Sequence, residues 1–248
     1  MNFLVVNDDG IEARGIRALV DYLKEEGNVY VFAPAVQQSG KSQSLSISGT
    51  IKAEEVDYPG ATWAMKVHGS PADCTKLGLQ LCKEDGIEID MVFSGVNMGS
   101  NLGKDTVYSG TVGAAMEAAL DGYHAVAVSV DHHEATEFEY ACKLATKLIP
   151  YIYKNLHPSI ILNINTPHLP AHKIKGVKFT TLGPRYYDDG FRLNNHGEYF
   201  LAGEAPAKNA AVTGSDIEAS VQGFASITPL SFDYTNYDAI KIIEEWSL

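Results

Sequence analysis

Cysteine and long apolar runs are scarce in this chain of 248 residues, and each scarcity excludes a class of protein. The three cysteines, Cys74, Cys82 and Cys142, form no C-x-x-C pair, so we expect neither a disulfide framework nor a zinc knuckle, and interpret them as small core residues. The first apolar run, Phe3 to Val6, is far shorter than a signal-peptide core or the roughly 20 residues that span a bilayer. The sequence therefore predicts a cytoplasmic protein without a membrane partner.

Positive charge is also in deficit, because 19 Lys and Arg face 31 Asp and Glu and leave a net charge of −12. Binding to a nucleic-acid polymer requires clustered Lys and Arg, so no such partner is expected. A small anionic substrate remains possible, since a metal ion makes a pocket locally positive. With 45% hydrophobic residues, the chain predicts an ordinary globular protein with a substantial core.

Several enzyme signatures are missing. The chain has no G-x-S-x-G elbow, which disfavours a serine hydrolase, and no G-x-G-x-x-G after its first strand, which disfavours a nicotinamide dehydrogenase. Gly40-Lys41-Ser42 matches the end of a phosphate-binding P-loop. Ala35, however, replaces the first glycine of that pattern, and the residues after Ser42 favour strand rather than helix, so a P-loop is not expected.

Short apolar runs alternate with helical periodicities through residues 1–166. The expected strands cover 3–6, 29–32, 62–67, 91–93, 125–130 and 160–164. The expected helices cover a segment ending near 26, then 71–81, 110–120 and 135–153. A polar loop is expected at 37–50, short strands near 45–53, and a Gly/Asn loop at 95–103. This alternation predicts an α/β fold with a doubly wound, mostly parallel, Rossmann-like sheet between helices.

Residues 167–248 carry a different pattern. Helical periodicity is lost from 167 to 235, where short extended segments at 176–181 and 225–227 are expected. Turn signals occur at Asp189-Gly190, Asn195-His196-Gly197 and Thr213-Gly214. We expect protruding β-hairpin arms and a final helix at 236–246, which together form a β-rich extension involved in oligomerisation. The predicted division is a catalytic core at 1–166 and an oligomerisation part at 167–248 of the same overall domain.

The first candidate site is Asn7-Asp8-Asp9-Gly10, which places two adjacent carboxylates at the carboxyl end of the first strand. Ligands bind at this edge of open α/β sheets. A polar turn with an Asp helix cap is the alternative, but two desolvated like charges are costly without a cation. Ser39, in the loop after the second strand, offers a neutral oxygen to a metal, unless that loop is simply solvated.

The second candidate site runs from Ser94 to Gly103 and continues to the start of a helix near 110. Its glycines allow close approach of the backbone to a ligand, and Asn97 and Asn101 offer amide groups. Ser109 and Thr111, with the free amides of the helix start, form a ready anion site. An ordinary strand-to-helix connection explains Ser109 as a cap, but it does not explain the density of Gly and Asn before it.

Taken together, these motifs resemble the SurE family of survival-protein nucleotidases in order and spacing. The resemblance is carried by Asn7 to Gly10, Ser39-Gly40, Ser94 to Asn97, Asn101 to Gly103 and Tyr108 to Val112, with weaker similarity at 69–74, 163–167 and 226–230. Two departures from the family pattern, Ser70 in place of Thr and Ala118 in place of Gly, lie away from the metal ligands and bear on substrate preference.

The resemblance implies a metal-dependent phosphomonoesterase that hydrolyses nucleoside 5′- and 3′-monophosphates and forms a homodimer or homotetramer. It implies one divalent ion per subunit, Mg²⁺ or Mn²⁺, on Asp8, Asp9, Ser39 and Asn97. This all-oxygen set suits a hard cation better than zinc. Asp8, Asp9 and Asn97 are the expected catalytic residues. The residues expected to hold the phosphate oxygens are Asn101, Ser109, Gly110 and Thr111.

Several alternatives stay open at this point. The attacking group is either a water activated by the metal or an aspartate that forms a covalent phosphoenzyme. As an alternative main activity, the protein is an exopolyphosphatase or a broad acid phosphatase. A further alternative is a non-catalytic sensor that uses the same loops to bind a nucleotide or phosphate. Base preference requires an aromatic or amide shelf, for which Tyr108, Tyr186 and Tyr187 are weak candidates.

Overall fold

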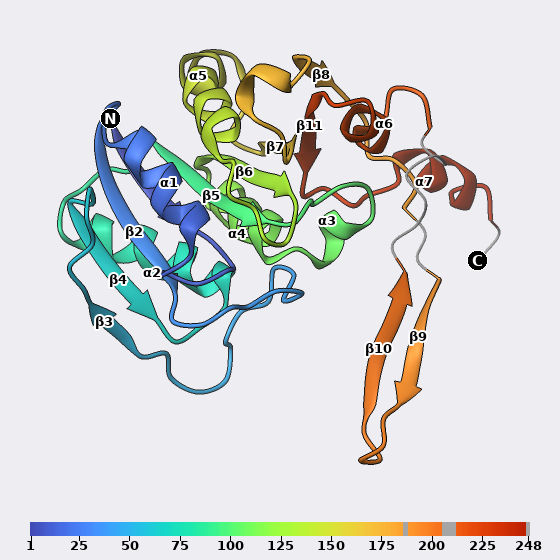
Figure 1. Cartoon of the computed structure of the whole chain (residues 1–248), viewed down its shortest axis with the longest axis horizontal. Coiled ribbons are helices and arrows are strands. Elements are labelled where there is room, and N and C mark those ends of the chain that lie inside the picture. The colour runs from blue at the N-terminus through green and yellow to red at the C-terminus, as the bar shows by residue number, and fades with distance from the viewer. Residues whose placement is uncertain (186–187, 205–211, 247–248) are drawn as a thin grey trace.

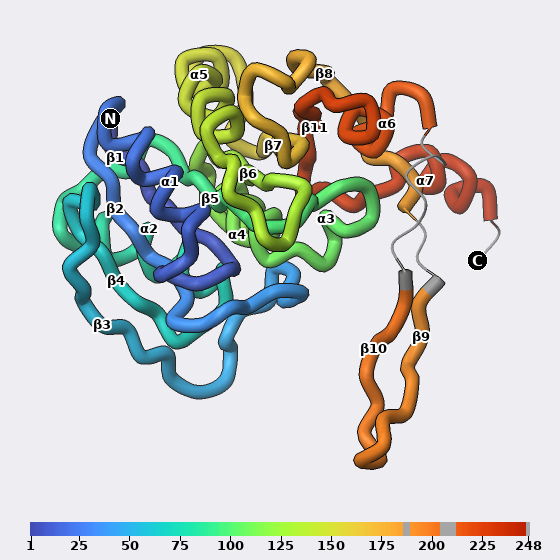
Figure 2. The backbone as a smooth tube through the Cα atoms, viewed as in Figure 1, coloured from blue at the N-terminus to red at the C-terminus, as the bar shows by residue number. Residues whose placement is uncertain are grey.

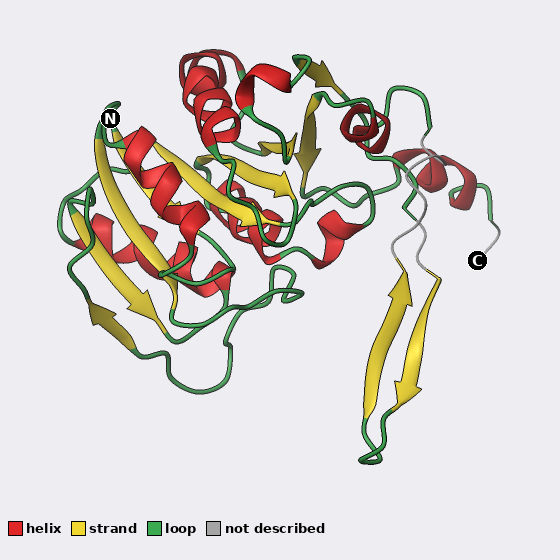
Figure 3. Ribbon diagram, viewed as in Figure 1, coloured by secondary structure: helices red, strands yellow, loops and turns green. Residues whose placement is uncertain are grey.

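The computed structural model describes residues 1–185, 188–204 and 212–246. Its main feature is a nine-stranded sheet in the order β3-β4-β2-β1-β5-β6-β7-β11-β8, with helices on both faces (Figures 1 and 3). The strands are β1 Asn2–Val6, β2 Asn28–Pro34, β3 Ala53–Glu55, β4 Trp63–Val67, β5 Met91–Met98, β6 His124–Asp131, β7 Ile160–Pro167, β8 Val177–Phe179, β9 Asp188–Leu193, β10 Tyr199–Glu204 and β11 Ala225–Ser231. The helices are α1 Arg14–Leu23, α2 Pro71–Glu84, α3 Asp105–Tyr108, α4 Gly110–Leu120, α5 Glu139–Asn155, the 3₁₀ helix η1 Ala171–Lys173, α6 Asp216–Val221 and α7 Tyr237–Ile243.

The central strands β4, β2, β1, β5, β6 and β7 are parallel. Strand β3 runs antiparallel to β4 at one edge, and β11 runs antiparallel to β7 and parallel to β8, which forms the other edge. Phe3 to Val6 in β1 are fully buried, as expected for a parallel strand covered on both faces. Helices α1 and α5 pack on one face of the sheet, and α2 and α4 pack on the other. The predicted doubly wound α/β fold is confirmed, and all three cysteines are buried and free.

The position of β1 decides where a ligand can reach the sheet. From β1 the chain crosses to β2 on one side and later returns to β5 on the other side. The loops that leave β1 and β5 therefore diverge at the carboxyl ends of two neighbouring strands, which is the usual binding crevice of open α/β sheets. Val6 and Ser94 are paired in register at this point.

Two expectations for the first 166 residues are wrong. Gly95 to Met98 continues β5 instead of starting a loop. Gly95 is needed there because a Cβ atom would lie 2.3 Å from the carbonyl oxygen of Val128 and because its φ is +139°. The other error concerns the strands expected near 45–53, since residues 45–52 form no strand and β3 begins only at Ala53.

In the described part of the C-terminal region, one pair of strands forms a hairpin and the other strands join the main sheet. Strands β9 and β10 pair through the expected turn at Asn195-His196-Gly197 and extend away from the core (Figure 2). Asp189-Gly190 is not a turn but lies inside β9. Strands β8 and β11 pair with each other, and β11 pairs with β7, rather than forming hairpins. The sequence also failed to predict α6, which Ser215 caps by accepting a hydrogen bond from the Glu218 amide at 3.2 Å.

The final helix, α7, is confirmed, and none of its residues is buried. Among the described residues, no helix combines the length and the apolar character that crossing a membrane requires.

Candidate active site

The two adjacent carboxylates lie directly beyond the end of β1. Asn7 closes the turn, because its Nδ2 donates to the Gly10 carbonyl oxygen at 2.8 Å, and the φ of +99° at Gly10 favours glycine. Strand β5 runs beside β1 and brings its own end to the same place. The Met98 amide donates to Asp9 Oδ2 at 2.9 Å, so Asn97, the preceding residue, lies beside the carboxylate pair.

Asp8 is held from the opposite side by the start of α4. Its side chain is almost fully buried, and the Thr111 hydroxyl donates to Oδ1 at 2.7 Å while the Thr111 amide donates to Oδ2 at 3.2 Å. A Cβ atom at Gly110 would lie 2.9 Å from the Cβ of Asp8, so glycine permits this contact. Burial raises the pKa of Asp8, and the hydrogen bonds from Thr111 lower it less.

Asp9 is the second member of the pair. Burial, with a smaller contribution from the charge of Asp8, raises the pKa of Asp9 to about 6, although the hydrogen bond from the Met98 amide opposes the shift. The Gln37 side chain also hydrogen-bonds Asp9 and lowers its pKa. Two carboxylates that share a poorly solvated position are costly when both are ionised, and a bound cation would offset that cost.

The remaining expected metal ligands lie beside this pair on two different elements. Asn97 is nearly buried, and its Nδ2 donates to the Gly99 carbonyl oxygen at 2.6 Å, which turns Oδ1 away from that contact. Ser39 is on the exposed loop after β2, and its Oγ accepts a hydrogen bond from Gln37 Nε2 at 3.1 Å. The Gln38 amide donates to the Asp8 carbonyl oxygen at 2.7 Å, which fixes this loop to the site.

The four residues expected to bind phosphate occupy two different environments. Ser109 caps α4, because its Oγ accepts from the Val112 amide at 3.1 Å, and it directly precedes Gly110 and Thr111 beside Asp8. Asn101 instead belongs to a buried network, where its Nδ2 donates to Ser129 Oγ at 2.9 Å. The structure therefore brings Gly110 and Thr111 into contact with Asp8, places Ser109 next to them, and commits the side-chain amide of Asn101 to a structural partner.

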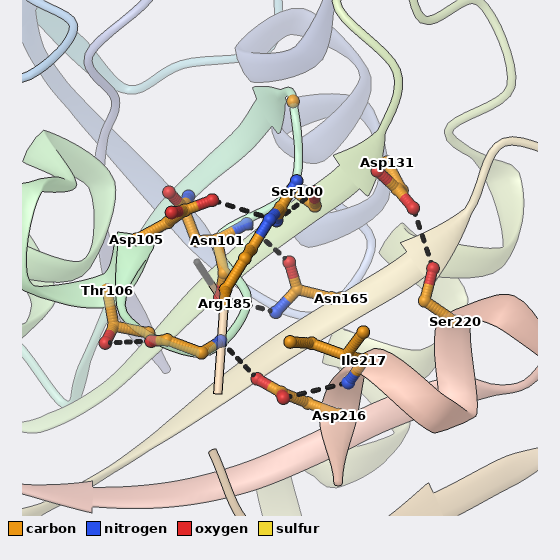
Figure 4. A network of polar contacts seen from close by, with 12 residues as sticks. Ser100, Asn101, Asp105, Thr106, Asp131, Asn165, Arg185, Asp216, Ile217 and Ser220 are labelled. Atoms are coloured by element: carbon orange, nitrogen blue, oxygen red, sulfur yellow. Dashed lines mark hydrogen bonds and ion pairs between the residues drawn. The ribbon is translucent and has the colours of Figure 1, made fainter. Parts of the chain in front are cut away.

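The network around Asn101 connects the loop after β5 to the C-terminal part of the chain (Figure 4). The backbone amide of Asn101 donates to Asn165 Oδ1 at 2.7 Å. Asp216, fully buried, accepts from the amides of Gly103 and Gly183, both at 2.8 Å. Burial raises the pKa of Asp216, and these backbone hydrogen bonds oppose the shift. The buried carboxylate of Asp216 therefore fixes both the loop after β5, at Gly103, and the segment before the hairpin, at Gly183.

Sequence reasoning missed several groups near the carboxylates. Gln37, which contacts both Asp9 and Ser39, lies two residues before the serine and could have been noticed through that spacing. His133 lies on an exposed loop, yet its charge lowers the pKa of Asp9, and a Cβ atom at Gly99 would lie 3.0 Å from its Nδ1. No sequence signal indicated Asp216. Tyr186 and Tyr187 lie outside the described residues.

Comparisons with known proteins agree with one another. The family model described as "Survival protein SurE" matches residues 3–189. A protein named 5′-nucleotidase SurE from Petrotoga mobilis is 36% identical over 99% of this chain and 99% of its own length, and one from Syntrophomonas wolfei is 37% identical over 97% and 92%. The crystal structure of SurE protein from Aquifex aeolicus superposes with a TM-score of 0.86 at 35% identity and covers 98% of both chains.

Proposed function

The chain belongs to the SurE family, and we propose that it is a 5′-nucleotidase, a metal-dependent phosphomonoesterase that converts nucleoside 5′- and 3′-monophosphates to nucleoside and phosphate. The observation that carries this proposal is the adjacent pair of a buried Asp8 and a partly buried Asp9 at the switch point of the sheet, with Asp8 against the N-terminus of α4. Relatives named for this activity over nearly their full length support it.

The residues around this pair fit a divalent metal ion. Among the described residues there is no cluster of three or more His, Cys, Asp or Glu, so the candidate ligand set combines the two carboxylates with neutral oxygens from Asn97 and Ser39. Hard oxygen donors of this kind suit Mg²⁺ or Mn²⁺, one per subunit. When bound, such an ion supplies charge neutralisation at the phosphate oxygens and lowers the pKa of a water.

The N-terminus of α4 is the expected phosphate-binding element. The positive end of its dipole favours an anion beside Asp8, although the Thr111 and Val112 amides already donate to Asp8 and to Ser109. The Ser109 oxygen already accepts a hydrogen bond, so its hydroxyl hydrogen is available to donate to a phosphate oxygen. Asn101 supports the site by fixing the loop after β5, since its amide nitrogen is bonded to Ser129.

In the proposed reaction a water attacks phosphorus, and the phosphorus–oxygen ester bond of the nucleotide breaks. Asp9 accepts the proton that the water loses, because a carboxylate beside a cation is ionised at neutral pH and can act as a general base. Thr111 holds Asp8 in a fixed orientation through two hydrogen bonds. The alcohol leaving group takes its proton from solvent.

The C-terminal region is proposed to form the contacts of a homodimer or homotetramer. Apolar side chains are exposed on both of its protruding elements, as Phe191 and Tyr199 show on the hairpin and Tyr237 and Ile242 on α7. Exposed apolar groups of this density mark protein interaction surfaces. Light scattering of the purified chain is expected to give twice or four times 26.9 kDa, and a monomer would contradict the assignment.

The decisive experiment measures phosphate release from 5′- and 3′-nucleoside monophosphates and a short polyphosphate, with Mn²⁺, with Mg²⁺ and with chelator. Metal-dependent release from the monophosphates is the expected result. Release mainly from polyphosphate would make the chain an exopolyphosphatase, and nucleotide binding without turnover would make it a sensor. A phosphoenzyme trapped on Asp8 or Asp9 would replace the attack by water with a covalent route.

A further inference from the structure

A cavity of about 670 Å³ lies between α3 and the β9–β10 hairpin. Tyr108 and Asp105 line it from α3, Arg185 lines it from the segment before the hairpin, and Leu201 and Gly203 line it from β10. Figure 1 shows the hairpin leaving the core on the side of α3. The cavity is therefore built by two parts of the chain that are about 90 residues apart in sequence.

This cavity adjoins the proposed phosphate site. Tyr108 is the last residue of α3, and Thr111, three residues later, donates two hydrogen bonds to Asp8. Three residues of extended chain span at most about 11 Å. The Tyr108 carbonyl oxygen also accepts from the Ser42 amide at 3.0 Å, in the loop that carries Ser39. A group joined to the phosphate through one sugar can therefore reach the cavity.

The lining of the cavity suits a flat, uncharged aromatic group. Tyr108 is 66% exposed, so its ring is available for stacking, and Leu201 adds an apolar surface from the hairpin. Gly203 has no side chain and leaves room beside Leu201. The lining also contains Lys104 and Asp189, so its charged residues are two cations and two anions, and Arg185 pairs with Asp105 at 2.8 Å. The wall therefore carries no net charge to attract a second phosphate.

The same ion pair fixes the wall that carries Tyr108. Arg185 Nη1 contacts Asp105 Oδ2 and also donates to Ser100 Oγ at 3.2 Å, and the two charged side chains are only 12% and 19% exposed (Figure 4). Asp105 is the first residue of the single-turn helix α3, and Tyr108 is its last. A mostly buried pair at one end of the turn therefore limits the movement of the tyrosine at the other end.

We infer that this cavity binds the base of the nucleotide, with Tyr108 stacking on the base and Leu201 closing over it from the hairpin. The inference rests on the proposed function, because it assigns the base-recognition part of that same site. It makes Tyr108 a specificity-determining residue. It also gives the hairpin a role in substrate selection.

The test compares Tyr108→Ala with Tyr108→Phe on two substrates, a purine nucleoside 5′-monophosphate and ribose 5-phosphate, which has the phosphate and sugar but no base. Loss of one stacking contact is expected to lower the ratio of kcat/KM for the nucleotide over ribose 5-phosphate by roughly 5- to 150-fold, mainly through KM. Tyr108→Phe keeps the ring and is expected to restore the ratio.

Two hairpin variants make the test independent of α3. Alternate residues of a strand face opposite sides, so Leu201 lines the cavity while Phe200 faces away from it. Leu201→Ala is expected to lower the ratio several-fold, and Phe200→Ala is the matched control that leaves it unchanged. Light scattering of each variant separates a change at the cavity from a change in assembly.

An equal loss on both substrates in Tyr108→Ala would mean that the residue acts on the catalytic loop, and an unchanged ratio would mean that the base binds elsewhere; either result overturns the inference. If the wild-type protein hydrolyses neither substrate, the proposed function fails. Calorimetric titration with the nucleotide then decides the inference separately, because equal affinity of the wild-type protein and Tyr108→Ala would refute it.

Discussion

Replacing Asp9 by asparagine should stabilise the metal-free protein while strongly lowering its activity. The asparagine side chain would keep an oxygen that accepts from the Met98 amide, so the geometry of the turn is preserved. The substitution would remove a carboxylate whose pKa burial raises from 3.8 to about 6. That shift of roughly 2 units corresponds to about 3 kcal/mol at 1.36 kcal/mol per unit, which is the cost of ionising the group in the folded state.

The stabilisation has a defined pH dependence. Well below pH 3.8 the carboxyl is protonated in both the folded and the unfolded chain, so its ionisation contributes nothing. As the pH rises from 3.8 to about 6, the unfolded chain releases its proton while the folded chain keeps it, and folding becomes less favourable. Above about 6 both states are ionised and the full cost applies. The benefit of Asp9→Asn is therefore largest at pH 8 and roughly half as large at pH 5.

Urea denaturation in the presence of chelator measures this effect at pH 8 and pH 5. The matched control is Asp85→Asn, at an exposed aspartate after α2. Asp9→Asn is expected to lose about a hundredfold or more in kcat with Mn²⁺, because an amide cannot accept the proton of the water. Equal stability of the variant and the wild-type protein at pH 8, or a gain that does not change with pH, would refute the assignment of Asp9 as a desolvated carboxylate.

Three further substitutions test the surroundings of this pair. Thr111→Val removes the hydroxyl that donates to Asp8, so it should lower metal affinity and kcat/KM by about 10- to 100-fold. The acidic limb of the pH–rate profile should move to higher pH, because this hydrogen bond lowers the pKa of Asp8. An unchanged acidic limb would argue against the contact. Gly110→Ala places a Cβ atom 2.9 Å from that of Asp8 and should lower metal affinity measured by calorimetry, a result that unaltered affinity would exclude. Asp216→Asn should lower the free energy of unfolding by about 2–4 kcal/mol in urea, because the amides of Gly103 and Gly183 lose a shared charged acceptor; a change below about 0.5 kcal/mol would contradict that role.

The sequence predicted the positions of the carboxylates well because they follow from local patterns. The apolar run that ends at Val6, just before Asn7 and the carboxylates, predicts a buried strand that ends there, and parallel strands bring their carboxyl ends to one edge. The same reasoning misjudged Gly95, whose glycine was interpreted as a loop signal. Its real cause is the Val128 carbonyl oxygen on the neighbouring strand, which leaves no space for a side chain.

Contacts between distant parts of the chain could not be predicted from local patterns. Asp216 reaches Gly103 across 113 positions, and it lies in a short helix whose six residues give too little periodicity to detect. Thr111 was expected to bind phosphate from its place at a helix start, yet both of its donors are occupied by Asp8. Which partner a donor takes depends on the tertiary arrangement, and sequence spacing does not contain that information.

The buried network connects the C-terminal part of the chain to the segment that leads to Asp8. Asp216 anchors Gly103 and Gly183, and Arg185, two residues after Gly183, anchors Asp105 at the start of α3. The segment from α3 to α4 then leads within a few residues to Thr111 and its contact with Asp8. A shift of the hairpin on assembly would change the position of Arg185 and, through its ion pair with Asp105, the position of α3. Assembly and substrate binding are therefore expected to be coupled, because the segment from α3 to α4 is in contact with the C-terminal region and also with Asp8.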